Sequence, residues 1–210
     1  MEIDPATRES RANYHFLTSA VMPRPVAWVT TKDPGTGIVN AAPFSWFQAV
    51  CADPPMVMLA IIERADGTPK DTVRNIRASK EFVVNVSPKA LLHEMVASSG
   101  DYPADVSEVD ALNLATTPSQ KVGPPRLAGS PVHLECRLAQ GVPLGRTQRV
   151  ALILGEVIHM AIDDAVVDAR GNLDPEKVTL VARMGGTNYC DTEAHYSVKR
   201  PAQEDLLRRE

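Results

Sequence analysis

Several common signals are missing from this sequence, and each absence excludes a class of protein. Nowhere in the 210 residues is there an apolar run of the roughly 18 residues that a membrane-spanning helix needs, so we expect no membrane span. The opening segment MEIDPATRES has neither a basic region nor an apolar stretch, so we expect no secretory signal there. The three cysteines, Cys51, Cys136 and Cys190, form no C-x-x-C pair, which favours buried, reduced thiols in a cytoplasmic protein.

Patterns typical of several ligand-binding classes are missing too. The net charge is −4 with both signs interspersed, which argues against nucleic acid as a partner, because a phosphate backbone requires a basic surface. The five histidines show no metal-ligand spacing, so the sequence predicts no metal site. Neither a G-x-S-x-G nucleophile motif nor a complete G-x-G-x-x-G dinucleotide motif is present.

What the chain does contain is a series of short strand candidates separated by turns. Residues 25–31 and 38–45 flank a turn cluster and are typical of a β-hairpin. Residues 56–62 are apolar at every position, which predicts a strand buried on both faces. Residues 81–87 and 178–186 are further strand candidates.

Two longer segments in the second half predict antiparallel pairing. In residues 131–141 apolar and polar side chains alternate, which places Cys136 on a buried face and His133 on an exposed one. Residues 149–162 are long for one strand, and Gly155 indicates a bulge or corner. Because no βαβ alternation, internal repeat or linker is visible, we expect one mostly β domain, residues 1–210, built as a closed or nearly closed antiparallel barrel.

Helices should be few and short. Residues 70–80 have helical character, and residues 89–99 predict a second short helix that places Met95 and Val96 at helical spacing. Residues 100–130 are weakly patterned and rich in Pro, Gly, Ser and Asp, so we expect a surface loop over the core or an arm that reaches a partner. The charged residues 200–210 should form a frayed tail.

The segment NAAPFSWFQAV, residues 40–50, is uncharged and contains three aromatic side chains, Phe44, Trp46 and Phe47. Pro43 interrupts it, although a central strand seldom contains a proline. An apolar and irregular segment of this kind indicates the wall of a ligand site rather than an ordinary core strand.

The best local signal for chemistry is GTPKDTVRN, residues 67–75. Lys70 lies between the hydroxyls of Thr68 and Thr72 at the start of a predicted helix, where unpaired N–H groups favour an anion such as phosphate. Plain helix capping by Thr68 or Asp71, with a solvated Lys70, is the alternative.

The order of these motifs resembles the flavin reductase-like family, the FMN-binding split-barrel proteins that include flavoredoxins and NAD(P)H:flavin oxidoreductases. The resemblance rests on RPVAWVTT, VNAAPFSWF, ADPPMVMLAI, DGTPKDTVRNI and EFVVNV, followed by SPVHLEC, GEV and ARMGGTNY. It covers about residues 15–190. The resemblance implies a homodimeric Greek-key split β-barrel that holds FMN near the subunit interface. The residues implied to bind FMN are Asn40, Ala41, Ala42, Pro43, Ser45, Trp46 and Phe47; Thr68, Lys70, Asp71 and Thr72; and Gly185, Gly186 and Tyr189.

Three positions need separate comment. Asp71 repels phosphate through its carboxylate, so we expect it to act through its backbone N–H or as a cap. Arg24, just before the first strand, is a weaker candidate for a residue close to the FMN. Cys51 stands where many relatives have serine; we expect a buried, inert thiol there, and the alternative is a position that touches the flavin through an altered contact.

By the same resemblance, NAD(P)H delivers a hydride to the flavin, which passes electrons to an acceptor that the sequence does not identify. The cofactor carries this chemistry, so no catalytic acid, base or nucleophile is predicted. Two alternatives remain: a flavoredoxin-like electron carrier without its own NAD(P)H turnover, and a barrel without redox function that binds another phosphorylated ligand. The apolar residues 40–50 beside the phosphate-binding candidate, residues 67–75, disfavour the barrel without redox function but not the electron carrier.

Overall fold

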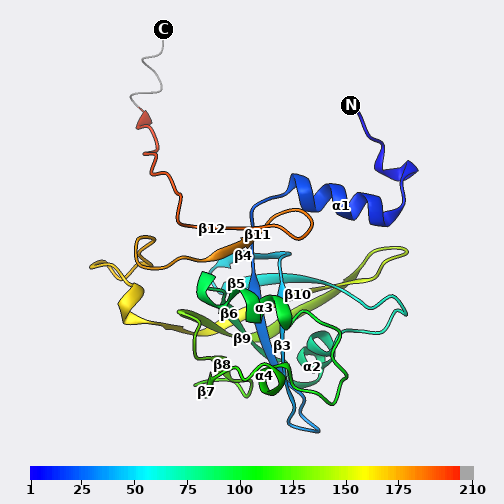
Figure 1. The fold of residues 1–210 in the computed structure, drawn as a ribbon, viewed down its shortest axis with the longest axis horizontal. Coiled ribbons are helices and arrows are strands. Elements are labelled where there is room, and N and C mark those ends of the chain that lie inside the picture. Colours follow the sequence, from blue (N-terminus) through cyan, green and yellow to red (C-terminus); the bar gives the residue numbers. More distant parts are fainter. Residues whose placement is uncertain (204–210) are drawn as a thin grey trace.

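Seven strands form one antiparallel sheet, and its two edge strands follow each other in the chain. In the computed structural model, which describes residues 1–203, the order across this sheet is β3-β2-β6-β9-β10-β5-β4 (Figure 1). The predicted mostly β, antiparallel fold with a few short helices is confirmed. The strands are β2 (Ala27–Lys32), β3 (Val39–Phe44), β4 (Phe47–Ala52), β5 (Pro55–Ile62), β6 (Glu81–Val86), β9 (Val132–Leu144) and β10 (Val150–Ile162).

Smaller elements surround this sheet. The strands β1 (Arg24–Pro25), β11 (Val181–Arg183) and β12 (Tyr189–Asp191) form a second sheet, and β7 (Thr116–Thr117) pairs with β8 (Arg126–Leu127). Helix α1 and the C-terminal segment lie on the same side of the main sheet (Figure 1). The helices are η1 (Pro5–Thr7), α1 (Ser10–Ala20), α2 (Asp71–Ser79), η2 (Lys89–Leu91), α3 (Leu92–Ala97), α4 (Glu108–Ala111) and η3 (Asp164–Val166).

The predicted hairpin is formed by β2 and β3, and it explains the proline in residues 40–50. Pro43 lies opposite Trp28 in this pair, on a strand that has a neighbour on one side only. An edge strand tolerates proline, because the missing N–H removes no ladder hydrogen bond on the open side. Pro43 therefore belongs to a strand after all, but to one at the margin of the sheet.

The core has two parts, which lie on opposite faces of β2 and β6. The interior core contains Val29, Leu59 and Phe82, and the outer core contains Trp28 of β2, Met95 of α3 and Val109 of α4. Strands β2 and β6 are consequently buried on both faces. The prediction that residues 56–62 are buried on both faces is wrong: β5 alternates between buried and half-buried residues, because its second face lines open clefts.

The predicted exposed face of residues 131–141 is wrong for its first half, because residues 116–127 cover His133 and Glu135, whereas Arg137 and Ala139 are exposed as predicted. The Glu135 carboxylate is fully buried and accepts hydrogen bonds from the backbone N–H groups of Gln120 (2.9 Å) and Lys121 (2.7 Å). His133 is buried beside it, with Nδ1 2.9 Å from Asn85 Oδ1. Segment 100–130 thus packs on the barrel of its own chain.

Some boundaries and exposures differ from those predicted. Residues 178–186 contain only the short strand β11. Its length is limited because its neighbours β1 and β12 pair with only two and three of its residues. Residues 89–99 divide into η2 and α3, and Val96 is exposed because the face of this short helix that meets the core carries Leu92 and Met95. Cys51 is exposed rather than buried, since β4 is an edge strand. Of the predicted frayed tail, residues 204–210 lie outside the described residues.

Gly155 interrupts the pairing of β10 with β9, as the sequence predicts, and the ring of Phe82 fills the space beside it. A Cβ on Gly155 would lie 2.3 Å from Phe82 Cζ. We expect Gly155→Ala to lower the free energy of unfolding by about 1–3 kcal/mol, because the core must shift to accept the methyl group. Urea denaturation measures this change.

Gly141→Ala is the matched control on the partner strand, where the added Cβ would lie 4.0 Å from Ile153 Cδ1. This change should alter the unfolding free energy by only about 0.5 kcal/mol. Equal losses for the two variants would show that the contact with Phe82 is not what excludes a side chain at position 155.

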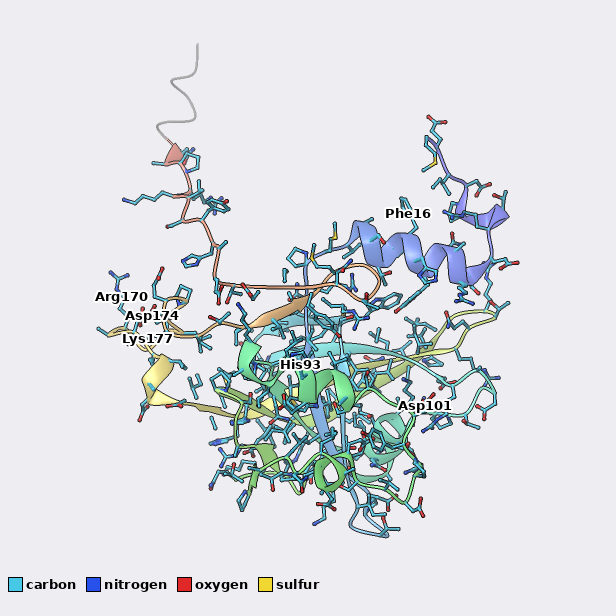
Figure 2. All side chains as sticks on the ribbon, viewed as in Figure 1. Phe16, His93, Asp101, Arg170, Asp174 and Lys177 are labelled. Atoms are coloured by element: carbon cyan, nitrogen blue, oxygen red, sulfur yellow. The ribbon has the colours of Figure 1, made fainter. Side chains whose placement is uncertain are left out.

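Burial, with a smaller contribution from the charge of Arg126, lowers the pKa of His133 to about 4. The unfolded chain therefore binds more protons than the folded protein between about pH 6.5 and pH 4. The free energy of unfolding should fall by about 2–3 kcal/mol as the pH drops through this window. His133→Gln should flatten the dependence, whereas His93→Gln at an exposed position (Figure 2) should not. Parallel pH profiles for wild type and His133→Gln would contradict this assignment.

Candidate functional site

The open gap between β3 and β4 contains the largest concentration of the predicted site residues. Ser45 and Trp46 carry the chain across this gap, and the carbonyl of Trp46 accepts a hydrogen bond from the N–H of Ala60 (2.9 Å) on β5. Beside them lies a cavity of about 490 Å³, which we call the main cleft. Its walls come from α1, the end of β3, the half-buried face of β5, the start of α2 and the segment after β11.

One wall of the main cleft is aromatic and apolar. The ring of Tyr14 on α1 stacks on Trp46, with ring centroids 5.9 Å apart and an interplanar angle of 27°. Pro43, Phe44 and Ile62 continue this wall. A flat and largely apolar ring is the kind of ligand group that such a surface accommodates.

Arg24 ties together three segments around the main cleft. Its guanidinium donates to the carbonyl oxygens of Thr18 (2.5 Å) and Val21 (2.7 Å) at the end of α1, and to that of Met184 (3.0 Å). Its Nε lies 3.4 Å from the Ser45 hydroxyl. Burial lowers the pKa of Arg24, but an arginine remains protonated, so it contributes a fixed positive charge as well as a clamp.

The start of α2 forms the cationic end of the main cleft. Lys70 is the N-cap residue in an extended conformation, and no side chain caps the helix. The first N–H groups of α2 therefore have no partner within the helix. Together with the Lys70 side chain, which lines the cleft, they favour an anion.

The carboxylate of Asp71, next to Lys70, is offset by two arginines. Arg64 donates to it at 2.5 Å, and Arg74 forms a second ion pair with it. Burial alone would raise the pKa of Asp71, but the hydrogen bond from Arg64 and the charge of Arg74 outweigh burial and lower it. Asp71 therefore does not cancel the positive charge at the start of α2.

Asn40 is the centre of a buried polar network that joins β3 to α2 and α4. Its Oδ1 accepts a hydrogen bond from the Thr72 hydroxyl (2.7 Å), and its Nδ2 donates to Glu108 (2.8 Å). Glu108 also accepts from the N–H of Ala41 (3.0 Å), and burial raises the pKa of this carboxyl. The side chains of Asn40 and Thr72 thus hold the framework of the site.

The structure brings some of the predicted residues together and separates others. Asn40, Ala42, Asp71 and Thr72 line a small cavity of about 50 Å³ that adjoins the main cleft. The residues of the predicted set that line the main cleft itself are Pro43, Ser45, Trp46, Lys70 and Gly186.

The other predicted residues lie outside both cavities. Ala41 is fully buried in the outer core, and the hydroxyl of Thr68 donates to Asp66 (2.6 Å). Phe47 lines a separate cleft below α1. Gly185 allows close approach to α1, since a Cβ there would lie 2.8 Å from Ser19 Oγ. Tyr189 packs against the outer core and bonds Arg183.

The sequence reasoning missed the contribution of α1 and of Arg183 to the main cleft. Tyr14 and Thr18 lie four residues apart, on one face of a helix, and both line the cleft. That spacing is the signal that could have identified α1, although it does not say which ligand the helix faces. Arg183 carries no local signal and reaches the cleft through the pairing of β11 with β1.

Within residues 1–203, no group of His, Cys, Asp and Glu side chains is arranged to hold a metal ion. No helix in this part of the chain is long and apolar enough to span a membrane.

Comparison with known proteins gives consistent results. A family model, the flavin reductase like domain, matches residues 18–179. A relative, an uncharacterized protein of Deinococcus radiodurans, is 43% identical over 195 residues, which cover 90% of this chain and 85% of that protein.

Two solved structures are similar over nearly their whole length. Nitrilotriacetate monooxygenase component B from Bacillus cereus has a TM-score of 0.89 and 28% identity, and the match covers 94% of this chain and 98% of that chain. A protein from Shewanella frigidimarina, described as a flavin reductase with a split barrel domain, has a TM-score of 0.79 and 20% identity over 96% and 99% of the two chains. The predicted split-barrel fold is thereby confirmed.

The role of Arg24 gives a test of this site. We expect Arg24→Ala to release α1 from the barrel, because each lost hydrogen bond to the charged guanidinium contributes about 1.5–3 kcal/mol. Trp46 then loses the ring of Tyr14, so acrylamide should quench its fluorescence more strongly, whereas the fully buried Trp28 stays protected. Chymotrypsin should cleave within α1 at least about ten times faster than in wild type.

Arg8→Ala is the control, since the exposed Arg8 makes no side-chain bond among residues 1–203 and lines none of the clefts described above. Unchanged quenching and cleavage in Arg24→Ala would show that other contacts suffice to hold α1.

Proposed function

The chain belongs to the flavin reductase like family, and from this premise we propose that it is an FMN-binding oxidoreductase that accepts a hydride from NAD(P)H. The electrons then pass to an acceptor whose identity is open; a partner oxygenase, iron and another electron carrier are the candidates. We propose that residues 1–210 act as one domain with a core of about residues 15–190.

One observation carries the assignment of FMN: the main cleft combines a stacked aromatic wall with a cationic helix start. FMN has a flat, uncharged ring system at one end and a phosphate at the other. The wall formed by Tyr14, Trp46 and Pro43 suits the ring, and Lys70 with the uncapped start of α2 suits the phosphate. The residues present therefore fit this cofactor.

The proposed mechanism divides the work between cofactor and protein. Bound flavin supplies the hydride-accepting chemistry. Lys70 and the first N–H groups of α2 would hold the phosphate, while Arg64 and Arg74 keep the charge of Asp71 from opposing it. Trp46 and Tyr14 would orient the ring and exclude water from one side. No side chain of this protein is assigned as acid, base or nucleophile.

We also propose that the protein acts as a homodimer that covers the site. Several apolar side chains on and after α1 are exposed, among them Phe16 (49%) and Val21 (59%), and Phe16 points away from the barrel (Figure 2). Below α1, Leu17, Trp46 and Met58 line an apolar cleft of about 420 Å³. Apolar surface of this extent is typical of an interface, and a second copy would cover both it and an FMN in the main cleft.

The test compares FMN with riboflavin, which lacks only the phosphate. Lys70→Ala should weaken FMN binding by roughly ten- to a hundredfold, because a charge-assisted hydrogen bond to phosphate contributes about 1.5–3 kcal/mol. Riboflavin affinity should hardly change, and the FMN deficit should shrink as salt rises. Titration followed by flavin absorbance or fluorescence measures both affinities.

Lys32→Ala, at an exposed position on β2, is the matched control and should leave both affinities unchanged. Failure of wild type to perturb FMN absorbance would overturn the proposal, and equal losses of FMN and riboflavin in Lys70→Ala would remove the phosphate assignment. Steady-state oxidation of NADH and NADPH with FMN, FAD or ferric iron separates a reductase from an electron carrier, which would bind FMN without turnover.

A further inference from the structure

A second cleft lies beside the main cleft, between α1 and two loops of the barrel. Its volume is about 510 Å³, close to that of the main cleft. Arg11 and His15 on α1 form one side, and Arg64, after β5, and Arg149, between β9 and β10, form the other. In Figure 1, α1 lies above the tips of these two loops. We call this space the arginine cleft.

The arginine cleft adjoins both ends of the proposed FMN site, since the cavities share lining residues. Tyr14 and His15 line the arginine cleft and the main cleft alike, so the two share a wall near the aromatic surface. Arg64 lines the arginine cleft and also the small cavity that contains Lys70 and Thr72. The arginine cleft therefore neighbours both the ring end and the phosphate end of a ligand held in the main cleft.

The charge of the arginine cleft is positive, although the whole chain carries a net charge of −4. Arg64 forms an ion pair with Asp71 (2.5 Å). Of the residues that the structure describes, Glu63 is the one carboxylate that lines the cleft, and it lies 3.8 Å from Arg77. Among residues 1–203, Arg11 and Arg149 have no acidic partner. Two guanidinium groups are thus available to an anion, and arginine binds phosphate oxygens through paired N–H donors.

We propose that the arginine cleft binds the adenosine-phosphate part of a dinucleotide whose other half occupies the main cleft. This inference rests on the proposed function. Arg11 and Arg149 bind the phosphates, and the rings of Tyr14 and His15 offer apolar faces to the base. The same group occurs in two sources: the adenylate half of FAD, which extends from the flavin phosphate, and the adenosine half of NAD(P)H, which extends from the nicotinamide.

The first experiment uses ADP as a probe, because ADP contains this group and no flavin. Calorimetric titration should show ADP binding to wild type and an affinity at least about tenfold lower in the double variant Arg11→Ala/Arg149→Ala, since charge-assisted contacts are lost. Arg146→Ala, on the same β9–β10 loop but outside the cleft, is the control and should match wild type. If the double variant does not fold, ADP affinity is measured in the single variants Arg11→Gln and Arg149→Gln, and each should bind ADP more weakly than wild type does.

The second experiment separates the two sources. If the group belongs to FAD, the double variant loses FAD affinity at least about tenfold while FMN affinity stays within about twofold. If it belongs to the nicotinamide donor, the KM for NADH or NADPH rises by a similar factor at unchanged FMN affinity.

Several outcomes would overturn the inference. These are no ADP binding to wild type, equal ADP affinity in wild type and the double variant, and an equal loss of FMN and FAD, which would make the arginines part of the FMN site itself. A wild-type protein that binds ADP but not FMN would refute the proposed FMN function and leave the adenosine-phosphate site supported, so the two failures are distinguishable.

Discussion

The gap between β3 and β4 is the constraint on which the other features of the site depend. Both strands are edges of the same sheet, and only Ser45 and Trp46 join them. A sheet edge exposes unpaired backbone groups and must be covered. Part of that cover comes from α1 and from the segment after β11, which Arg24 holds in place. The clefts arise because α1 and the segment after β11 lie over the gap without pairing with β3 or β4.

Charge pairing around the start of α2 keeps one end of the gap positive. Three carboxyl groups around α2 are engaged by other residues: Asp71 by two arginines, Glu108 by Asn40 and a backbone N–H, and Glu63 by Arg77 in the last turn of the helix. A buried carboxylate without such partners would shift its pKa or repel an anion. These three acidic residues therefore connect neighbouring segments while their charges are offset by their own partners.

Local pattern was enough to predict the β2–β3 hairpin and the bulge at Gly155, because both depend on neighbouring residues. It failed where distant segments provide cover: His133 looks exposed by alternation, yet residues 116–127 pack over it. The site divides in the same way. Lys70 stands in a readable motif, whereas Tyr14 and Arg183 reach the main cleft from opposite ends of the chain. The spacing of Tyr14 and Thr18 indicates a helix face but not the cleft that it lines, and Arg183 has no local signal at all.

The strand order has a consequence for synthesis on the ribosome. One half of the sheet, β3-β2-β6, and the other, β5-β4, consist of early segments, and the late hairpin β9–β10 is inserted between them. Until residue 162 has left the exit tunnel, the facing edges of β6 and β5 have no strands paired between them. A nascent chain of 130 residues thus holds most of the proposed binding motifs but lacks the central strands β9 and β10, so the sheet can be completed only late in translation or after release.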